Sequence, residues 1–156
     1  MRELFEAEYK KIDKSLYLVA VGYLHNTEDA KDAVSEAVIC AYQSFSGLKH
    51  KQYFKTWLTR IVINKCKDFL RKRRYTEELT DAIDVFYDMP INDIEIMDAI
   101  CRLSPKYTPY ITLRFYNDMT YDEMAKTLKQ PVSTVKHQTH AALEKLKFLL
   151  EGDVVL

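Results

Sequence analysis

Apolar residues recur at steps of three and four along most of the chain, which is the period of an amphipathic helix. The first apolar stripe predicts a helix over residues 2–24, and a second helix starts at Thr27, an N-cap with acids in the following turn. Gly47 ends the second helix, and the loop "LKHKQYF" follows. A long third helix then carries a nearly continuous apolar stripe through Trp57 and Ile61. Strand-like alternation is scarce, so the predicted fold class is all-α.

The helical pattern stops at the segment "YTEELTDAIDVFYDMPI", which is acidic and ends near a proline. We interpret residues 76–91 as an acidic linker that joins two small helical domains, residues 1–75 and residues 92–156. The second domain begins with a helix at about 92–102, whose apolar residues again share one face.

The rest of the second domain carries clear helix-start signals. A Thr-Pro pair places the start of the next helix at Pro109, because a proline deeper inside would cost a hydrogen bond. Thr120 and Glu123 form a capping box for the helix after that, and Ser133 caps the last helix, which runs to about Leu150. The stretch "MTYDEMAKTLKQPVSTVKHQTHAALEKL" is therefore predicted to be a helix-turn-helix.

The distribution of charge changes the first impression that composition gives. The chain has 156 residues, 47% hydrophobic and 29% charged, with a net charge of zero, which by itself argues against a nucleic-acid binder. Residues 1–75, however, hold 15 Lys/Arg against 9 Asp/Glu, and residues 76–91 hold five acids and no base. Residues 92–156 hold 8 bases against 9 acids. Such segregation indicates separate tasks along the chain.

Several classes of function find no support. With only three glycines, the chain lacks a Gly-rich phosphate loop, and its amino terminus lacks the apolar run of a signal peptide. No stretch approaches the roughly 20 apolar residues of a membrane span. Cys40, Cys66 and Cys101 are widely spaced, which favours reduced thiols in a cytoplasmic protein over disulfides. We interpret His137 and His140 as surface histidines and expect no catalytic, metal or cofactor site.

The third predicted helix and the loop before it are strongly basic, with ten Lys/Arg and one acid in residues 49–74. Helical geometry puts four of these bases on one outward strip: Arg60, Lys67, Arg71 and Arg74. Such a strip would neutralise phosphates and give salt-dependent, sequence-tolerant affinity. His50, Tyr53 and Phe54, just before it, offer flat surfaces on which unpaired bases could stack. The alternative is a solvated basic face beside a pair of core aromatic residues.

Two further surfaces have both a functional and a plain interpretation. Asp29, Asp32 and Glu36 share one face of the second predicted helix and could dock a basic partner, although helix starts attract acids in any case. On the last helix, Gln138 could pair with an adenine edge, as expected of a recognition helix in the major groove. The alternatives for that helix are a plain helical hairpin or a surface that contacts protein.

In chain order, these segments resemble a known family. The strings "EDAKDAVSEAVICAYQSF" and "YFKTWLTRIVINKCKDFLRKRR" resemble the second conserved region of bacterial sigma factors of the extracytoplasmic-function (ECF) group, and "LSPKYTPYITLRFYNDMTYDEMAKTLKQPVSTVKHQTHAALEKLK" resembles their fourth region. The matches cover about residues 5–74 and 94–150. The resemblance implies a cytoplasmic, non-enzymatic subunit that directs promoter recognition and transcription initiation. It implies core RNA polymerase, promoter DNA and an anti-sigma factor as partners, with no small-molecule substrate, cofactor or membrane insertion.

The resemblance also assigns surfaces to matching positions. Core polymerase binding falls on Asp29, Asp32 and Glu36. Binding of the −10 element, including capture of a flipped base by residues 49–53, falls on Lys49, His50, Lys51, Gln52, Tyr53, Lys55, Arg60, Asn64, Lys67, Arg71 and Arg74. Reading of the −35 element falls on Ser133, Thr134, Lys136, His137, Gln138 and His140. The acidic linker matches the segment that runs toward the RNA exit path of polymerase, where negative charge would mimic RNA.

The chain departs from the family pattern at a few positions: Ser35 replaces a usual glutamine, Lys129-Gln130 a turn glycine and an apolar residue, and Gln138, Thr139 and Ala141 a common Arg, Leu and Arg. We therefore expect the free −35 domain to bind DNA weakly, with polymerase docking and the basic strip supplying most of the affinity. Two alternatives remain. One is a sigma-like adaptor that binds a partner protein without reading DNA, and the other is a dimeric helix-turn-helix regulator.

Overall fold

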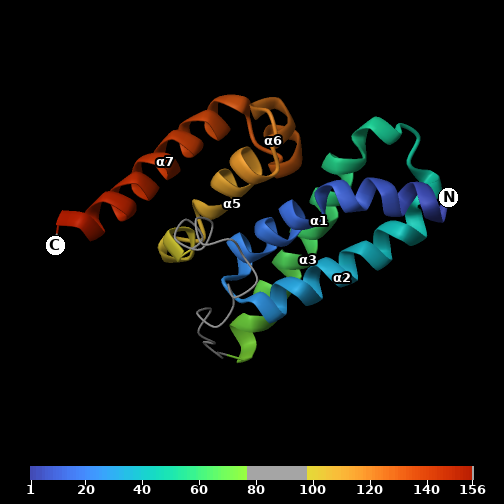
Figure 1. Cartoon of the computed structure of the whole chain (residues 1–156), viewed down its shortest axis with the longest axis horizontal. Helices are drawn as coiled ribbons and strands as arrows, with labels where there is room; N and C mark the ends of the chain where they lie inside the picture. The colour runs from blue at the N-terminus through green and yellow to red at the C-terminus, as the bar shows by residue number, and fades with distance from the viewer. Residues whose placement is uncertain (77–97, 156) are drawn as a thin grey trace.

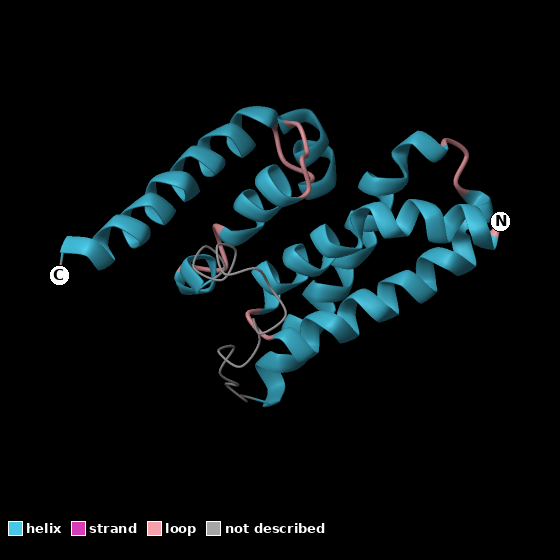
Figure 2. Cartoon of the chain, viewed as in Figure 1, coloured by secondary structure: helices cyan, strands magenta, loops and turns pink. Residues whose placement is uncertain are grey.

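Helices joined by short loops and turns make up the part of the protein that the computed structural model describes, which is residues 1–76 and 98–155 (Figure 2). The side chains of residues 74–76 and 152–155 also lie outside this description. No strand occurs in the described part of the chain, so the predicted all-α class is confirmed. The predicted linker, residues 76–91, falls almost entirely outside the described residues.

The first unit, residues 1–76, consists of three helices that pack against one another (Figure 1). They are α1 (Arg2–Leu24), α2 (Thr27–Ser44) and α3 (Phe54–Thr76), and two short 3-10 turns, η1 (Phe45–Gly47) and η2 (Lys51–Tyr53), connect the last two. Edge-to-face aromatic contacts pack the start of α1 against η1 and the start of α3. The ring centroids of Phe5, Phe45 and Phe54 lie 5.2 to 5.7 Å apart, and Trp57 packs beside them.

The α1–α2 turn corrects one predicted cap. Asn26, and not Thr27, is the N-cap of α2, and its side chain accepts a hydrogen bond from the backbone N–H of Asp29 at 2.9 Å. Thr27 is already helical and buried. His25 takes the left-handed conformation that ends α1, with φ 49°, and burial lowers the pKa of its imidazole.

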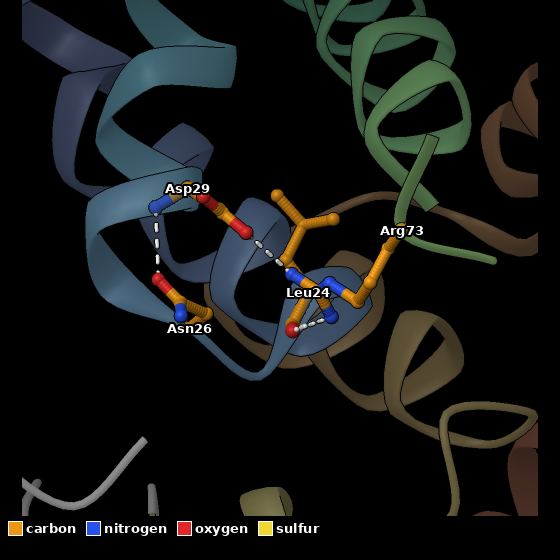
Figure 3. A network of polar contacts seen from close by, with 4 residues as sticks. All are labelled: Leu24, Asn26, Asp29 and Arg73. Carbon is orange, nitrogen blue, oxygen red and sulfur yellow. Dashed lines mark hydrogen bonds and ion pairs between the residues drawn. The ribbon is translucent and has the colours of Figure 1, made fainter. Parts of the chain in front are cut away.

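Arg73 ties the end of α3 to this turn, as Figure 3 shows. Its guanidinium donates to the carbonyl oxygen of Leu24 at 2.7 Å and to the carboxylate of Asp29 at 2.6 Å. The pair is partly buried, with side-chain exposures of 28% and 37%. One arginine therefore satisfies a carbonyl at the end of α1 and neutralises an acid in the first turn of α2.

The second unit, residues 98–155, begins with a helical segment at 98–102. It continues with α5 (Thr108–Ile111), the π-helical turn η4 (Thr112–Tyr116), α6 (Tyr121–Leu128) and α7 (Val132–Val155). Pro109 lies in the first turn of α5, as predicted. The capping box of Thr120 and Glu123 is confirmed, since both of its hydrogen bonds are present.

The predicted cap of the last helix is wrong by about two residues. Ser133 lies inside α7, whose backbone ladder begins with the N–H of Val135 donating to the carbonyl of Pro131 at 3.1 Å. Proline supplies the fixed φ of a helix start and its missing N–H is not needed there, so the helix begins before the serine.

The two units pack against each other, with α1 against α5 and η4 and α3 against α6 (Figure 1). The buried apolar residues of both units form one continuous cluster. This contact determines which surfaces of α3 remain accessible.

Candidate nucleic-acid interface

The loop between α2 and α3 presents an exposed aromatic pair. The rings of His50 and Tyr53 meet edge to face at 6.0 Å, and Tyr53 is 56% exposed. Lys51 is held inward, because its ammonium group lies 3.9 Å from the Phe45 ring centroid and donates to the Phe45 carbonyl at 2.9 Å. Phe54, in contrast to the expectation, is 3% exposed and cannot stack on a base, because it belongs to the aromatic core.

The predicted basic strip of α3 is only partly outward. Asn64, Lys67 and Arg71 are exposed, and Arg71 forms an ion pair with Asp68 one turn away. Lys49 and Gln52 in the preceding loop are exposed as well, and Lys55 is half-buried. Arg74 lies in α3, but its side chain is outside the described residues.

Arg60 is the exception on this strip. It is half-buried and faces the second unit, where its Nη2 donates to the carbonyl oxygen of Lys126 at 2.9 Å. Its Nε is buried and makes no hydrogen bond. Helical periodicity placed Arg60 correctly on the face opposite the core of its own unit, but another helix, α6, covers that face.

The three acids of α2 differ in their surroundings. Asp32 and Glu36 are exposed, whereas Asp29 is paired with Arg73. Sequence patterning missed two apolar neighbours on this side of the helix: Ile39 is 60% and Tyr42 47% exposed. The spacing of the sequence could have revealed Ile39. It follows Glu36 by three residues, and Glu36 follows Asp32 by four, so all three share one face of the helix. Tyr42 also packs edge to face on Phe5 at 5.4 Å.

The amino-terminal part of α7 carries an open polar face. Ser133, Thr134, Lys136, His137 and His140 are exposed and Gln138 is half-buried, while Val135, Thr139 and Ala142 are buried on the opposite face. All six side chains predicted to read the −35 element therefore lie in the amino-terminal part of α7.

Cations flank the start of α6. The guanidinium carbon of Arg114 lies 4.7 Å and the ammonium group of Lys136 5.8 Å from the ring centroid of Tyr121. Arg114 also donates to the carbonyl of Met119 at 2.9 Å, which fixes it beside the amino terminus of the helix-turn-helix. Sequence patterning did not single out Arg114, because its partner groups become neighbours only after folding.

The turn of the helix-turn-helix lacks glycine but still contains a residue in the left-handed backbone conformation that usually favours glycine. Lys129 ends α6 in the left-handed conformation with φ 56°. Gln130 then accepts a hydrogen bond from the Tyr110 hydroxyl at 2.7 Å, which holds the turn against α5. A lysine therefore occupies a backbone conformation that favours glycine.

Two of the three cysteines are kept in the un-ionised thiol form by burial. All three are free thiols, and Cys66 is buried. Burial raises the pKa of Cys66 to about 12 and that of Cys101 to about 11, so neither of these two ionises near neutral pH.

Comparison with known proteins agrees with this geometry. The family described as Sigma-70 region 2 matches residues 9–76, and the family described as Sigma-70, region 4 matches residues 93–146. An RNA polymerase sigma-E factor of Streptomyces avermitilis is 30% identical over 129 residues, which cover 80% of this chain and 72% of that protein. The ECF RNA polymerase sigma factor SigW of Bacillus subtilis is 26% identical over 152 residues, covering 85% of this chain and 81% of that protein.

A solved structure shares the fold. It is the sigma factor RpoE in complex with the anti-sigma factor NepR from Bartonella quintana, with a TM-score of 0.82 and 19% identity. The match covers 94% of this chain and 96% of that one.

None of the described helices combines the length and apolarity needed to cross a membrane. The two sigma-70 regions follow one another in order, and relatives named as sigma factors match along both. The chain therefore belongs to the ECF group of the sigma-70 family of RNA polymerase sigma factors, which are not enzymes themselves but direct core RNA polymerase to promoters.

Proposed function

We propose that this protein contacts promoter DNA with two separate surfaces, the −10 element with residues 1–75 and the −35 element with residues 92–156. The observation that carries the proposal is that one chain has two unlike exposed surfaces: a basic helix beside an exposed aromatic pair, and a helix-turn-helix with an open polar helix end. The first suits a strand with unpaired bases and the second an intact duplex.

The −10 surface consists of the loop residues 49–53 and the exposed side chains of α3. His50 and Tyr53 would stack against unpaired bases, and Lys67 and Arg71 would contact phosphates. Their exposure supports this role. The remaining members of the proposed surface are Lys49, Lys51, Gln52, Lys55, Arg60, Asn64 and Arg74.

The −35 surface is the exposed start of α7. Gln138 would read an adenine edge, while Ser133, Thr134 and Lys136 would contact phosphates or bases and His137 and His140 would border them. The surface holds only one full positive charge among these six residues. Weak binding by this unit alone follows, because phosphate neutralisation dominates affinity for DNA.

Polymerase docking is proposed for the outward face of α2. Asp32 and Glu36 are exposed there, and the exposed Ile39 and Tyr42 extend the same side of the helix with apolar area. Asp29 contributes indirectly, by holding Arg73 and with it the relative position of α2 and α3. A mixed acidic and apolar surface suits a basic helical partner.

Control by an anti-sigma factor in the cytoplasm completes the proposal. The Bartonella quintana sigma factor that shares this fold was crystallised with its anti-sigma factor NepR, which supports a similar type of partner here. The mixture of exposed apolar and charged side chains on α2 would suit such a partner as well as polymerase.

The deciding experiment is run-off transcription with purified core RNA polymerase, this protein and a genomic library of its host. We expect discrete transcripts that require the protein, and their upstream sequences would give both promoter elements. Binding to polymerase without transcripts would favour the adaptor alternative. No binding to polymerase would contradict the proposal.

Replacing Lys67 and Arg71 together with Ala should impair promoter opening and spare polymerase binding, because both side chains are exposed on the −10 surface. Each lost phosphate contact should also reduce the salt slope of single-strand binding by about 0.7. The matched control replaces Lys10 and Lys11 on α1, which removes the same charge elsewhere. Equal effects of the two double variants would show that only net charge matters.

Replacing Gln138 with Ala should alter preference at one or two −35 positions, by about 1–3 kcal/mol for a good bidentate contact. Transcription from a panel of single-base promoter variants would measure this. A uniform loss across all sequences would instead mean that Gln138 contacts only the DNA backbone.

A further inference from the structure

The loop between α2 and α3 is tied back to the end of α2. Phe45 is the C-cap of α2, and its carbonyl oxygen accepts a hydrogen bond from the backbone N–H of Leu48 at 3.0 Å. Further along the loop, the N–H of Tyr53 donates to the carbonyl oxygen of His50 at 3.1 Å. The tip is open, since a Cβ added at Gly47 would meet no atom within 4 Å. Each of the two hydrogen bonds closes a single 3-10 turn, η1 or η2.

Lys51 connects the two turns. Its ammonium group donates to the Phe45 carbonyl at 2.9 Å and lies 3.9 Å from the centroid of the Phe45 ring. Phe45 is 1% exposed and packs edge to face on Phe5 and Phe54. Carbonyl groups at the end of a helix lack helical partners, and the helix dipole favours a cation there. One charged group thus fastens η2 both to the end of α2 and to the aromatic core.

The two lysines of the loop differ in their surroundings. Lys49 is exposed, whereas Lys51 is half-buried. Lys51 lies within the −10 surface by its place in the chain, yet its charge already acts on a carbonyl and a ring of its own protein. A phosphate would have to displace both contacts before it could bind this ammonium group.

The direction of Lys51 also determines that of its neighbours. A 3-10 turn has three residues per turn, so His50 and Tyr53 lie on one side of η2 and Lys51 on another. The two rings meet edge to face at 6.0 Å, and Tyr53 is 56% exposed. Attachment of Lys51 to Phe45 therefore leaves the aromatic pair on the outer side of the loop.

We propose that Lys51 is a positioning residue and not a DNA contact: its ammonium group fastens the loop to the end of α2 and holds His50 and Tyr53 in the arrangement that receives an unpaired base. The inference rests on the proposed −10 function of this loop. A loop that is already ordered loses less conformational entropy on binding, so the fastening contributes to affinity without touching DNA. A phosphate contact would instead contribute to the salt dependence of binding.

Three variants of the full chain separate positioning from direct contact. Lys51→Met keeps an unbranched side chain and removes the charge and the donors. Lys51→Arg keeps the charge and a donor for the Phe45 carbonyl. Lys49→Met is the matched control, because it removes one positive charge from an exposed position of the same loop. Circular dichroism melting verifies that each variant is folded.

Amide hydrogen exchange measured by NMR tests the fastening without DNA. The N–H groups of Leu48 and Tyr53 close the two turns, so loosening of the loop exposes both to exchange. Loss of one charge-assisted hydrogen bond should speed their exchange by about tenfold or more in Lys51→Met. The rates should stay near those of the wild type in Lys49→Met and Lys51→Arg. Equal rates in Lys51→Met and the wild type would overturn the fastening.

Fluorescence anisotropy with two labelled strands of about 12 nucleotides tests the positioning. One strand is oligo-dT, and the other is abasic and carries the same phosphates. In Lys51→Met the preference for oligo-dT over the abasic strand should fall severalfold, while the salt slope stays that of the wild type. Lys49→Met should keep the preference, and its salt slope should fall by about 0.7 for one lost phosphate contact. Lys51→Arg should restore the preference.

The two kinds of measurement distinguish the ways in which the proposal could fail. A salt slope reduced in Lys51→Met as in Lys49→Met would identify Lys51 as a phosphate contact and overturn the proposal. An unchanged preference for oligo-dT in Lys51→Met, despite faster exchange, would overturn the positioning of the aromatic pair. Failure of the proposed −10 function is recognised separately, because the wild type would then bind both strands equally while the exchange rates still differ. That result would also overturn the role of the fastening in binding.

Discussion

At the scale of single residues, charge alone did not determine the role of each arginine. Arg60, Arg71 and Arg73 all lie on the basic helix α3, yet they face another unit, solvent and the α1–α2 turn, respectively. Helical periodicity puts Arg60 and Arg71 on one outward strip and leaves Arg73 off it. Their partners come from segments at distant positions in the chain, so only the folded structure separates their roles.

Replacing Arg73 with Ala should lower the free energy of unfolding by about 1–2 kcal/mol, because Asp29 and the Leu24 carbonyl would lose a charge-assisted donor at a partly buried site. Urea unfolding followed by far-UV circular dichroism measures this. The matched control is Arg71→Ala, whose ion pair with Asp68 is exposed and should matter by less than about 0.5 kcal/mol. Similar losses in both variants would contradict a structural role for Arg73.

At the scale of elements, helix periods were predicted well and helix starts less well. The capping box of α6 was predicted because two residue types at fixed spacing define it. The start of α2 was not, because Asn26 and Thr27 are adjacent and both can cap. The start of α7 was missed because Pro131 immediately precedes the first helical residue, Val132, and accepts the first helical hydrogen bond, so the helix begins before the more familiar serine.

Replacing Lys129 with Gly should stabilise the helix-turn-helix by up to about 1 kcal/mol, since glycine adopts the left-handed conformation of this turn without the steric cost that lysine incurs. The melting temperature should rise. Lys126→Gly provides the opposite control, because an exposed position within α6 should lose about 0.5–1 kcal/mol. A loss of stability in both variants would mean that the Lys129 side chain makes a contribution of its own.

At the scale of the whole molecule, we expect the contact between the two units to couple their stabilities, because α1 packs against α5 and η4 and α3 packs against α6. Trp57 is the only tryptophan and lies in the first unit, on the same helix as Thr59 and Arg60. Its fluorescence therefore reports on the first unit, whereas circular dichroism reports on helices of both.

Coupling predicts that the two signals give the same urea midpoint in the wild type, because docking adds its free energy to whichever unit would unfold first. Asn117 of the second unit donates from Nδ2 to the Thr59 hydroxyl of α3 at 2.9 Å, so in Asn117→Ala the circular dichroism transition should begin at lower urea, while the Trp57 transition moves less. The control is Thr139→Ala, which removes a buried hydroxyl that donates to the Val135 carbonyl within α7. It should lower stability while the two transitions keep their wild-type relation. Separate midpoints already in the wild type would contradict coupling.

The sequence by itself determined the all-α class, the apolar faces of the helices and the position of the helix-turn-helix, because periodicity and capping are local properties. It also placed Lys67, Arg71 and the exposed residues of α7 on outward faces. Only the tertiary structure decided that Phe54 is core, that Arg60 bonds to α6 and that Gly22 of α1 lies directly against Thr112 of the second unit. The physical reason is that these three depend on contacts between residues far apart in the chain, and a helical pattern specifies which face is buried but not what covers it.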